Sequence, residues 1–435
     1  MHSIHSIAYI IQIIIYKSCK YSVLCKIECK IRGYMPLKFH IFSLQSKEHS
    51  GAGLMQYKGK TIFCNENKEA KIPPKIPLKE VIKYYYRYPK NAKPKHKIPF
   101  IDSNFKIRKD TPHIAWLGHS SLFFTHNDIA ILVDPLFSMY ASPFACINRA
   151  FSQTKCYKND DFPHALLVII THSHFDHLDK SSILSLDTQT MYFICPLEVG
   201  IYLRKWGIKG SKIIELDWWQ GVSFENVLDS SPNGWVQGVG VCNLWISESK
   251  NFKNVKNDTI AAESSSKDSK NKHAPTQKKS EILKITATPA QHNSARLGDF
   301  NKTLWASFVL EFSPNTPQYK KVFLSGDGGY YTHFKRIGDM FQGFDLACLE
   351  SGQFNHAWRY SHSFPFEILQ EAKDLQTSMV LPIHWARFVA GSHEWNEVIR
   401  FLYENLHKLN IPCVAPKIGE LYPIGTTYDN QMWWE

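Results

Sequence analysis

The sequence is poor in three features, and each shortage limits the class of protein to which it can belong. No apolar run approaches the roughly 18–20 residues of a membrane-spanning helix, so a multi-span membrane protein is excluded. The ten cysteines are scattered over 435 residues instead of clustering as in a small disulfide-rich domain, which fits a reducing compartment. Acidic residues are scarce at the start, since residues 1–110 contain 22 Lys or Arg but only 7 Asp or Glu. Hydrophobic residues make up 44% of the chain, which excludes a wholly disordered protein.

The excess positive charge lies entirely in the N-terminal quarter, because residues 111–435 have a slight excess of acids. A basic segment favours contact with an anionic surface, either lipid or nucleic acid, and a solvated Lys-rich lead-in is the alternative. Aromatic residues are interleaved with it, as at membrane interfaces, among them Tyr84, Tyr85, Tyr86, Tyr88 and Phe100. No RNA-recognition motif is present, so no nucleic-acid partner is expected. We expect a cytoplasmic protein with peripheral contact to anionic membrane.

Composition divides the chain into four parts. Residues 1–54 form an uncertain N-terminal extension, because Met35 and Met55 are alternative starts, and residues 55–110 form a basic Pro- and Lys-rich arm with one short helix near Leu78–Tyr86. Residues 111–425 have the pattern of a compact domain, and residues 426–435 form a C-terminal tail. The polar, aperiodic stretch 246–280 predicts a disordered insertion in that domain.

Strand and helix patterns recur in both halves of residues 111–425, with strands predominating. Strands are predicted in a hairpin formed by Ile114–Phe124 and Asp128–Asp134, and at Ala165–Thr171, Lys212–Leu216, Leu283–Ala287, Ala306–Phe312, Lys321–Ser325, Asp345–Leu349 and Met379–Ile383. Helices are predicted at Pro196–Trp206, Thr332–Phe341, Glu367–Leu375 and Trp395–Lys408. This α/β pattern predicts two sheets with helices outside them, an αββα four-layer sandwich.

The strongest chemical signal is the heptapeptide Thr171–His177 (THSHFDH), which directly follows the apolar run ALLVIIT. Its spacing cannot bring four ligands to one ion without strain, but it can offer His172 and His174 to one metal and Asp176 and His177 to a second. Imidazole nitrogen and carboxylate oxygen both suit zinc, and they are also compatible with manganese and iron. A His-rich surface loop is the alternative, but this motif is rare by chance after a buried strand.

Each ion needs further ligands from elsewhere in the chain. Three candidates each follow a predicted strand, where an α/β sheet places its sites: His292, Asp327 and His384. Singly, a histidine after a strand is more often structural. Together, and in this order, the three residues complete a set of seven for two metals.

These residues belong to an ordered series of motifs that resembles the metallo-β-lactamase superfamily, and within it the N-acylphosphatidylethanolamine-hydrolysing phospholipase D branch. The motifs are WLGHS (116–120), VDP (133–135), THSHFDHLD (171–179), PAQH (289–292), GDGGY (326–330) and PIHW (382–385). The resemblance covers roughly residues 70–425 without the insertion. The same branch also contains a sugar-phosphate lactonase.

The resemblance implies a role for each residue. His172, His174 and His292 would hold one Zn²⁺, Asp176, His177 and His384 would hold the other, and Asp327 would bridge them. Two such ions activate water and polarise a phosphoryl oxygen, and Asp176 or Asp327 would orient the attacking water. His362 would contact substrate phosphate or support a ligand, or else be a surface-turn histidine. Asp134 and His119 are candidates for hydrogen bonds to ligating groups, and Asp134 could equally serve a plain Asp-Pro turn.

Three departures from the branch lie on the expected substrate side. Gly328 replaces a threonine of the usual GDTGY motif, Phe366 stands where an acid is expected, and a Gly-Pro-Lys/Arg-Arg-Phe element is blurred into residues 145–151. These three departures weaken the prediction of the substrate more than the prediction of the metal site.

We therefore interpret the protein as a binuclear zinc-dependent hydrolase of phosphodiesters. Its expected substrate is an N-acylphosphatidylethanolamine-type phospholipid. A soluble sugar-phosphate lactonase of the same fold and a nuclease are alternatives within enzymes. A non-catalytic metal-binding protein at the membrane surface is the alternative of another class. A homodimer is a further expectation, and the Ile-, Lys- and Asn-rich composition points to an AT-rich bacterial genome.

Overall fold

The structure is a computed structural model that describes residues 38–46, 49–70, 89–142, 148–152, 154–164, 166–226, 280–296, 299–389 and 391–435. The expected short helix near Leu78–Tyr86 and the insertion up to residue 279 lie outside the described residues. The strands are β1 (Lys38–Ser43), β2 (Gly53–Tyr57), β3 (Lys60–Cys64), β4 (Lys109–Trp116), β5 (Leu122–Asn127), β6 (Ile129–Val133), β7 (Leu166–Ile169), β8 (Thr190–Pro196), β9 (Ile213–Leu216), β10 (Gln220–Asn226), β11 (Ser280–Thr288), β12 (Ser307–Phe312), β13 (Lys320–Leu324), β14 (Leu346–Glu350), β15 (Val380–Ile383) and β16 (Leu421–Pro423). The helices are α3 (Lys180–Leu186), α4 (Gly200–Lys205), α5 (His333–Phe341), α6 (Pro365–Asp374) and α7 (Glu397–His407).

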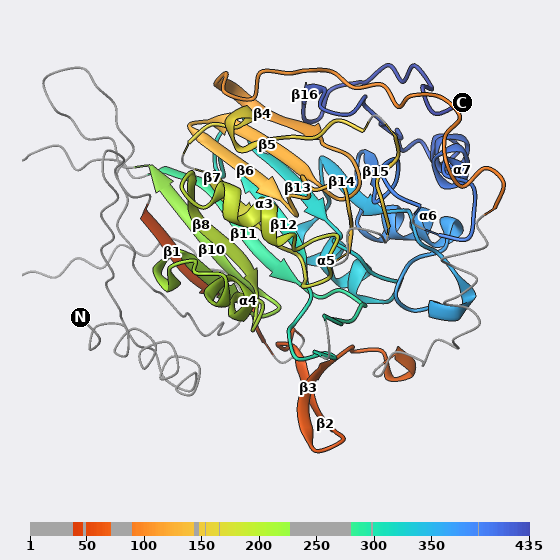
Figure 1. Ribbon diagram of the computed structural model, residues 1–435. Coiled ribbons are helices and arrows are strands. Elements are labelled where there is room, and N and C mark those ends of the chain that lie inside the picture. The colour runs from red at the N-terminus through yellow and green to blue at the C-terminus, as the bar shows by residue number, and fades with distance from the viewer. Residues whose placement is uncertain are drawn as a thin grey trace, which may run out of the picture.

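Two seven-stranded sheets form the centre of the described molecule (Figure 1). One has the strand order β1-β10-β11-β12-β13-β14-β15, and the other has the order β16-β4-β5-β6-β7-β8-β9. Each sheet is antiparallel at one side and parallel at the other, since β13, β14 and β15 run parallel, as do β6, β7, β8 and β9. Parallel strands end at the same edge of a sheet, which positions the loops that follow them together.

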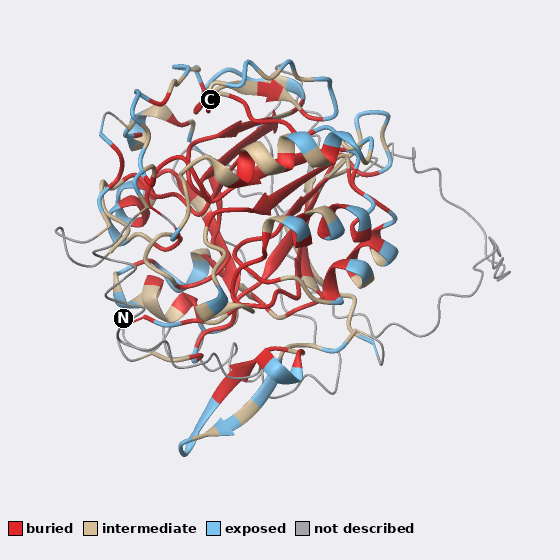
Figure 2. Ribbon diagram, turned by 90° about the vertical axis from the view of Figure 1, so that its right-hand side faces the viewer, coloured by how far each residue is buried: buried red, intermediate tan, exposed pale blue. Residues whose placement is uncertain are grey.

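The helices lie outside the two sheets, and the apolar core lies between the layers (Figure 2). Helix α5 buries one stripe, Phe334, Ile337 and Phe341, and the Phe334 ring meets Phe323 of β13 with the ring centroids 5.9 Å apart. The buried strands are rich in β-branched residues and leucine, as in β6 (IAILV) and β7 (LLVI). The expected αββα sandwich is therefore confirmed.

Most predicted elements are present within a few residues of their expected ends. The exception is the strand predicted over Ile114–Phe124, which is wrong, because β4 ends at Trp116 and β5 begins at Leu122. Between them the chain reverses through Gly118 (φ 93°) and His119 (φ 53°), a left-handed conformation that ends a strand. This turn carries His119 toward the edge where the other candidate residues gather.

The N-terminal residues contribute two elements that no sequence pattern predicted. Strand β1, which falls within the expected extension 1–54, pairs antiparallel with β10 at the edge of one sheet. Strands β2 and β3 form a hairpin that protrudes from the body, with Leu54 at its exposed part (Figures 1 and 2). The division into an extension, an arm and a domain stays a prediction. No helix in the described part of the chain is long and apolar enough to cross a membrane.

Candidate metal centre

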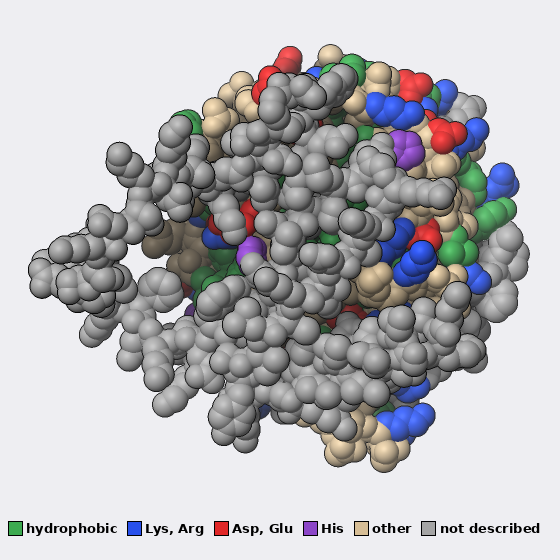
Figure 3. All heavy atoms as spheres, turned by 90° about the vertical axis from the view of Figure 1, so that its left-hand side faces the viewer, with side chains coloured by type: hydrophobic (Ala, Val, Ile, Leu, Met, Phe, Trp, Pro, Cys, Tyr) green, Lys and Arg blue, Asp and Glu red, His purple; other side chains and the backbone are tan. Residues whose placement is uncertain are grey.

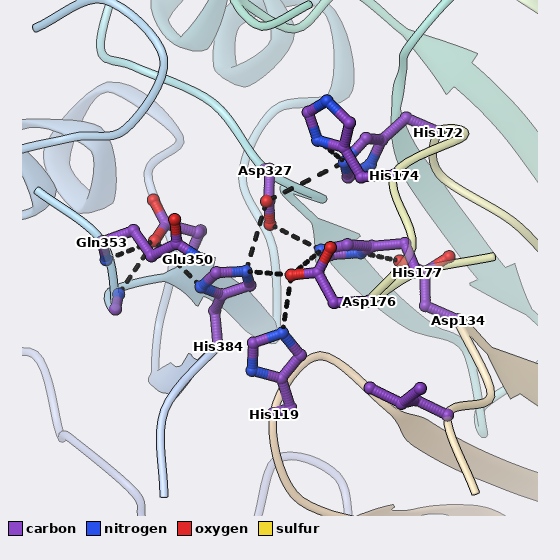
Figure 4. A network of polar contacts seen from close by, with 12 residues as sticks. His119, Asp134, His172, His174, Asp176, His177, Asp327, Glu350, Gln353 and His384 are labelled. Atoms are coloured by element: carbon purple, nitrogen blue, oxygen red, sulfur yellow. Dashed lines mark hydrogen bonds and ion pairs between the residues drawn. The ribbon is translucent and has the colours of Figure 1, made fainter. Parts of the chain in front are cut away.

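The seven predicted ligands come from four loops that each follow a strand. The Thr171–His177 loop follows β7, His292 follows β11, Asp327 follows β13 and His384 follows β15. Their side chains lie together in two groups, in each of which the ligand atoms lie within 4.8 Å of one another. Figure 4 labels all of them except His292 and shows those six side chains pointing into one shared space. The structure thus places all seven where the sequence expected them, and their roles as ligands stay a prediction.

The first group contains His172, His174, His292 and Asp327. The Nδ1 atom of His174 lies 2.9 Å from Nε2 of His172 and 3.1 Å from Nε2 of His292. Both of those Nε2 atoms lie 3.9 Å from Oδ2 of Asp327. Three ring nitrogens and one carboxylate oxygen therefore face a common point, which is the donor number of a tetrahedral zinc site.

The second group contains Asp176, His177, His384 and also His119. Oδ2 of Asp176 lies 3.0 Å from Nε2 of His119, 3.4 Å from Nε2 of His384 and 3.7 Å from Nε2 of His177. The sequence indicates His119 only as a candidate for a hydrogen bond to a ligating residue. In the structure its ring is one of the four side chains whose donor atoms converge in the second group.

Asp327 lies between the two groups. Its Oδ1 is 3.1 Å from Nε2 of His177, and its Oδ2 is 3.2 Å from Nε2 of His384. Because the same Oδ2 faces His172 and His292 at 3.9 Å, the carboxylate contacts both groups at once. This position suits a carboxylate that bridges two cations.

Unsatisfied polar atoms at this place fit a metal. Nε2 of His177, Nε2 of His384 and Oδ1 of Asp327 are buried and form no hydrogen bond of normal geometry among the described residues, although the rings lie within ion-pair distance of the carboxylate. Buried polar atoms are normally satisfied, and leaving one unpaired costs about 1–3 kcal/mol. Cations held between these atoms would satisfy all three, and the imidazole and carboxylate donors suit zinc, manganese or iron.

Hydrogen bonds behind the ligands fix which ring nitrogen faces the centre. Nδ1 of His177 donates to Oδ2 of Asp134 at 2.7 Å, and Nδ1 of His292 donates to the carbonyl of Ser361 at 2.9 Å. Asp134 also accepts hydrogen bonds from the main chain and the hydroxyl of Thr171. Each imidazole thereby points its Nε2 atom toward the centre, the usual arrangement around metal-binding histidines.

The electrostatics differ between the two groups. Burial lowers the pKa of His174 to about 4 and holds the pKa values of His172 and His292 well below their ordinary range, so these rings are neutral. Burial alone would lower the pKa of His384, but the nearby carboxylates, Asp327 first, raise it to about 10. Asp327 stays ionised, because His177 and His384 outweigh the effect of its burial. The histidines of the first group are therefore neutral and can bind a cation directly. His384 in the second group is protonated when no cation is bound.

His362 lies beside both groups, and its ring centroid is 5.3 Å from that of His292 and 5.7 Å from that of His384. Glu350, which no sequence pattern singled out, places Oε1 3.4 Å from Nδ1 of His362 and 3.5 Å from Nδ1 of His384. Main-chain N–H groups of Gly352 and Gln353 hold that oxygen (Figure 4). Glu350 is the last residue of β14, so the strand-end rule that found Asp327 could have found it.

A cavity of about 760 Å³ borders the Thr171–His177 loop. Phe175 lines it, and Nη1 of Arg296 donates to the carbonyls of Ser173, at 2.9 Å, and Leu178. Its lining combines basic, acidic and aromatic side chains, which are Lys180, Lys205, Arg296 and Lys302, Asp179 and Asp299, and Phe175, Tyr202 and Trp206. The Arg296 guanidinium stacks 4.1 Å from the centroid of Phe175.

The two sheets with paired histidine–aspartate groups at their shared edge form a metal-dependent hydrolase fold with two candidate metal sites. The family model described as the beta-lactamase superfamily domain matches residues 130–232 and 251–385, more than half of the chain. The chain belongs to the metallo-β-lactamase superfamily, as the sequence motifs predicted.

Individual relatives are distant. An uncharacterized protein of Mycobacterium tuberculosis is 26% identical over 76% of this chain and 73% of its own length. The mitochondrial N-acyl-phosphatidylethanolamine-hydrolyzing phospholipase D of Saccharomyces cerevisiae is 28% identical over 70% of this chain, which spans 54% of that enzyme. Among solved structures, Igni18, a metallo hydrolase of Ignicoccus hospitalis, matches 73% of this chain and all of its own with 17% identity and a TM-score of 0.43.

Proposed function

We propose that this hydrolase is a binuclear zinc-dependent phosphodiesterase of phospholipase D type that acts on N-acylphosphatidylethanolamine-like phospholipids. The observation that carries the proposal is the position of Asp327, which belongs to one four-residue group of donors and also faces His177 and His384 of the other. The yeast relative and a 24% identical relative from Caenorhabditis elegans are both named for this reaction, which supports the substrate class.

His172, His174 and His292 would hold one ion, and Asp176, His177 and His384 the other, with Asp327 shared. Two divalent cations held there would lower the pKa of water and polarise a phosphoryl oxygen. Water oxygen bonds to phosphorus, the bond from phosphorus to the ethanolamide oxygen breaks, and the leaving oxygen takes a proton.

The carboxylates and His362 would orient the reactants in this step. Asp176 and Asp327 would accept hydrogen bonds from the attacking water. Glu350 faces Nδ1 of His362, so the opposite ring nitrogen of His362 is the one that would bind a phosphate oxygen.

The cavity beside the loop supports a lipid substrate. Four basic side chains, Lys180, Lys205, Arg296 and Lys302, outnumber Asp179 and Asp299 in its lining and leave net positive charge for a phosphodiester. Phe175, Tyr202 and Trp206 supply apolar surface for an acyl chain. Aromatic bodies beside basic groups suit molecules with one charged and one apolar end.

The test is hydrolysis of a substrate panel by the purified full chain with and without a chelator. The panel contains N-acylphosphatidylethanolamine, bis-p-nitrophenyl phosphate, and lactones with and without a sugar phosphate. We expect the phospholipid to be cleaved to N-acylethanolamine and phosphatidic acid, with activity lost to the chelator and restored by Zn²⁺. If only the lactones are hydrolysed, the protein is a lactonase and the proposed phospholipase function is wrong. Absence of turnover with metal bound would favour a non-catalytic metal-binding protein.

Contact with an anionic membrane is the second part of the proposal. Much of the N-terminal basic excess lies outside the described residues, and on the face in Figure 3 the described Lys and Arg side chains are dispersed among acidic and apolar ones. A well-placed Lys or Arg contributes about 1 kcal/mol to binding an anionic surface. Co-sedimentation with anionic and neutral liposomes at two salt concentrations tests this, and binding that ignores lipid charge and salt would contradict it.

A further inference from the structure

Asn65, the residue after β3 in the protruding hairpin, is hydrogen-bonded to the main chain of the candidate ligand His292. Its Nδ2 donates to the carbonyl of His292 at 2.8 Å, and its Oδ1 accepts from the N–H of His292 at 3.0 Å. The two residues are 227 positions apart in the sequence, and Asn65 is buried. Hairpin and ligand are therefore joined directly.

The Asn65 amide uses its full hydrogen-bonding capacity at this place. Nδ2 also donates to the carbonyl of Ala70 at 2.8 Å, and Oδ1 also accepts from Nε1 of Trp305 at 3.1 Å. An amide has two donor hydrogens and two acceptor lone pairs, so all four hydrogen-bonding positions of the Asn65 side chain are occupied. Aspartate would keep the acceptor and lose both donors, and alanine would lose all four bonds.

His292 is consequently held at three points. Asn65 fixes its main-chain N–H and carbonyl, and the carbonyl of Ser361 fixes its ring through Nδ1. With the main chain and the ring both fixed, the Nε2 atom can lie only near its observed place, 3.1 Å from Nδ1 of His174. None of the other six candidate ligands has a contact of this kind to the hairpin among the interactions of the described residues.

The hairpin is itself anchored to the segment that carries His292. The main-chain N–H of Phe63 donates to the carbonyl of Asn301 at 2.8 Å, and the Asn301 side chain returns a bond to the carbonyl of Phe63. Oδ1 of Asn301 also accepts from the N–H of Ser294, two residues after His292. Phe63 and Asn65 at the end of the hairpin therefore hold the main chain in place at His292 and Asn301.

We propose that Asn65 is a positioning residue for the metal site formed by His172, His174 and His292. This inference rests on the metal centre of the proposed function, and it concerns a residue outside the segment matched by the family model. Losing groups that orient a metal ligand typically costs about 10–100-fold in metal affinity. The loss falls on this site, because Asp176, His177 and His384 are oriented by other groups.

The experiment compares metal binding by the full chain carrying Asn65→Ala, Asn65→Asp or the control Asn67→Ala. Asn67 is also a buried amide, two residues away, and among the described residues its Oδ1 accepts a local bond from the N–H of Glu69. Stripped protein is titrated with Zn²⁺ against a chromophoric chelator, and Co²⁺ spectra follow the two sites separately. We expect wild type to bind two ions, Asn65→Ala to lose about 10–100-fold in affinity at one site only, and Asn65→Asp to fall between them.

The outcomes separate this inference from the metal centre itself. If wild type binds two ions and Asn65→Ala binds both with unchanged affinity, the positioning role is wrong while the centre stands. Equal weakening of both sites in Asn65→Ala also overturns the role, because it indicates a general loosening of the fold. Wild type that takes up no ion refutes the centre and the role together. Should Asn65→Ala fail to fold, Asn65→Asp, which keeps the acceptor for His292 and Trp305, decides by the same comparison.

Discussion

His119 and His384 are joined through their main chains at the meeting point of the two sheets. The N–H of His384 donates to the carbonyl of His119 at 2.8 Å, and the two rings lie 4.1 Å apart between centroids. Both residues have positive φ angles, 53° and 70°, so each chain turns sharply where it delivers its ring. The turn between β4 and β5 in one sheet is thereby fixed to the end of β15 in the other.

This pairing predicts that His119 contributes to the second metal site. His119→Ala removes the Nε2 atom that lies 3.0 Å from Asp176, so metal affinity at this site should fall by about 10–100-fold. The His172, His174 and His292 site should keep its affinity. Metal titration checks this, with His113→Ala, a half-buried histidine of β4, as the control. Unchanged affinity at both sites would leave His119 with a purely structural role.

The sequence pointed to the seven candidate ligands because each of them follows a strand, and strand ends at one edge of an α/β sheet are brought together by topology. It could not predict Asn65 in the same way. An amide in a Lys-rich segment has no periodic signal, and its partners are main-chain groups of His292, which carry no residue-specific pattern. Strand β1 was missed for a related reason, because its six residues form a short edge strand paired on one side only.

The bridging position of Asp327 makes it the most sensitive of the candidate residues. Asp327→Asn keeps the size of the side chain but removes the charge that faces His177 and His384. We expect phosphodiester turnover to fall to the rate without enzyme and the metal content per chain to drop. Metal analysis and activity of the same preparation check this, with Asp339→Asn on the exposed face of α5 as the control. Retention of both metal and activity would exclude a bridging role.

Proton release should accompany metal binding, and at one site only. The pKa of His384 is raised to about 10, and carboxylates hold the pKa of His177 well above its ordinary value, so both rings are protonated at neutral pH. They must lose those protons to bind a cation through nitrogen, so affinity there should rise with pH toward 10. His172 and His292 are already neutral and should release none.

Calorimetric titration with Zn²⁺ in buffers of different ionisation enthalpy measures the protons released at each of the two binding steps. We expect one step to depend on the buffer and the other to be independent of it. Two buffer-independent steps at neutral pH would show that His177 and His384 are not protonated before the metal binds.

Glu371 in α6 should lower the stability of the folded protein at neutral pH. Burial raises its pKa well above the ordinary value, and the negative charges of Glu350, Glu367 and Asp374 add to the effect. A carboxyl whose pKa is higher in the folded state binds more protons there, so the stability falls as pH rises from about 4.5. Glu371→Gln keeps an acceptor for the hydroxyl of Ser363 and removes the ionisation.

We therefore expect Glu371→Gln to raise the free energy of unfolding at pH 8, by about 1.4 kcal/mol for each unit of pKa difference between the folded and unfolded states. The gain should shrink as the pH falls and vanish below pH 4.5, where wild-type Glu371 is protonated in both states. Denaturant unfolding at pH 8, 6 and 4 measures it, with Glu404→Gln on the exposed face of α7 as the matched control. A gain that is the same at all three pH values would mean that ionisation of Glu371 is not its cause.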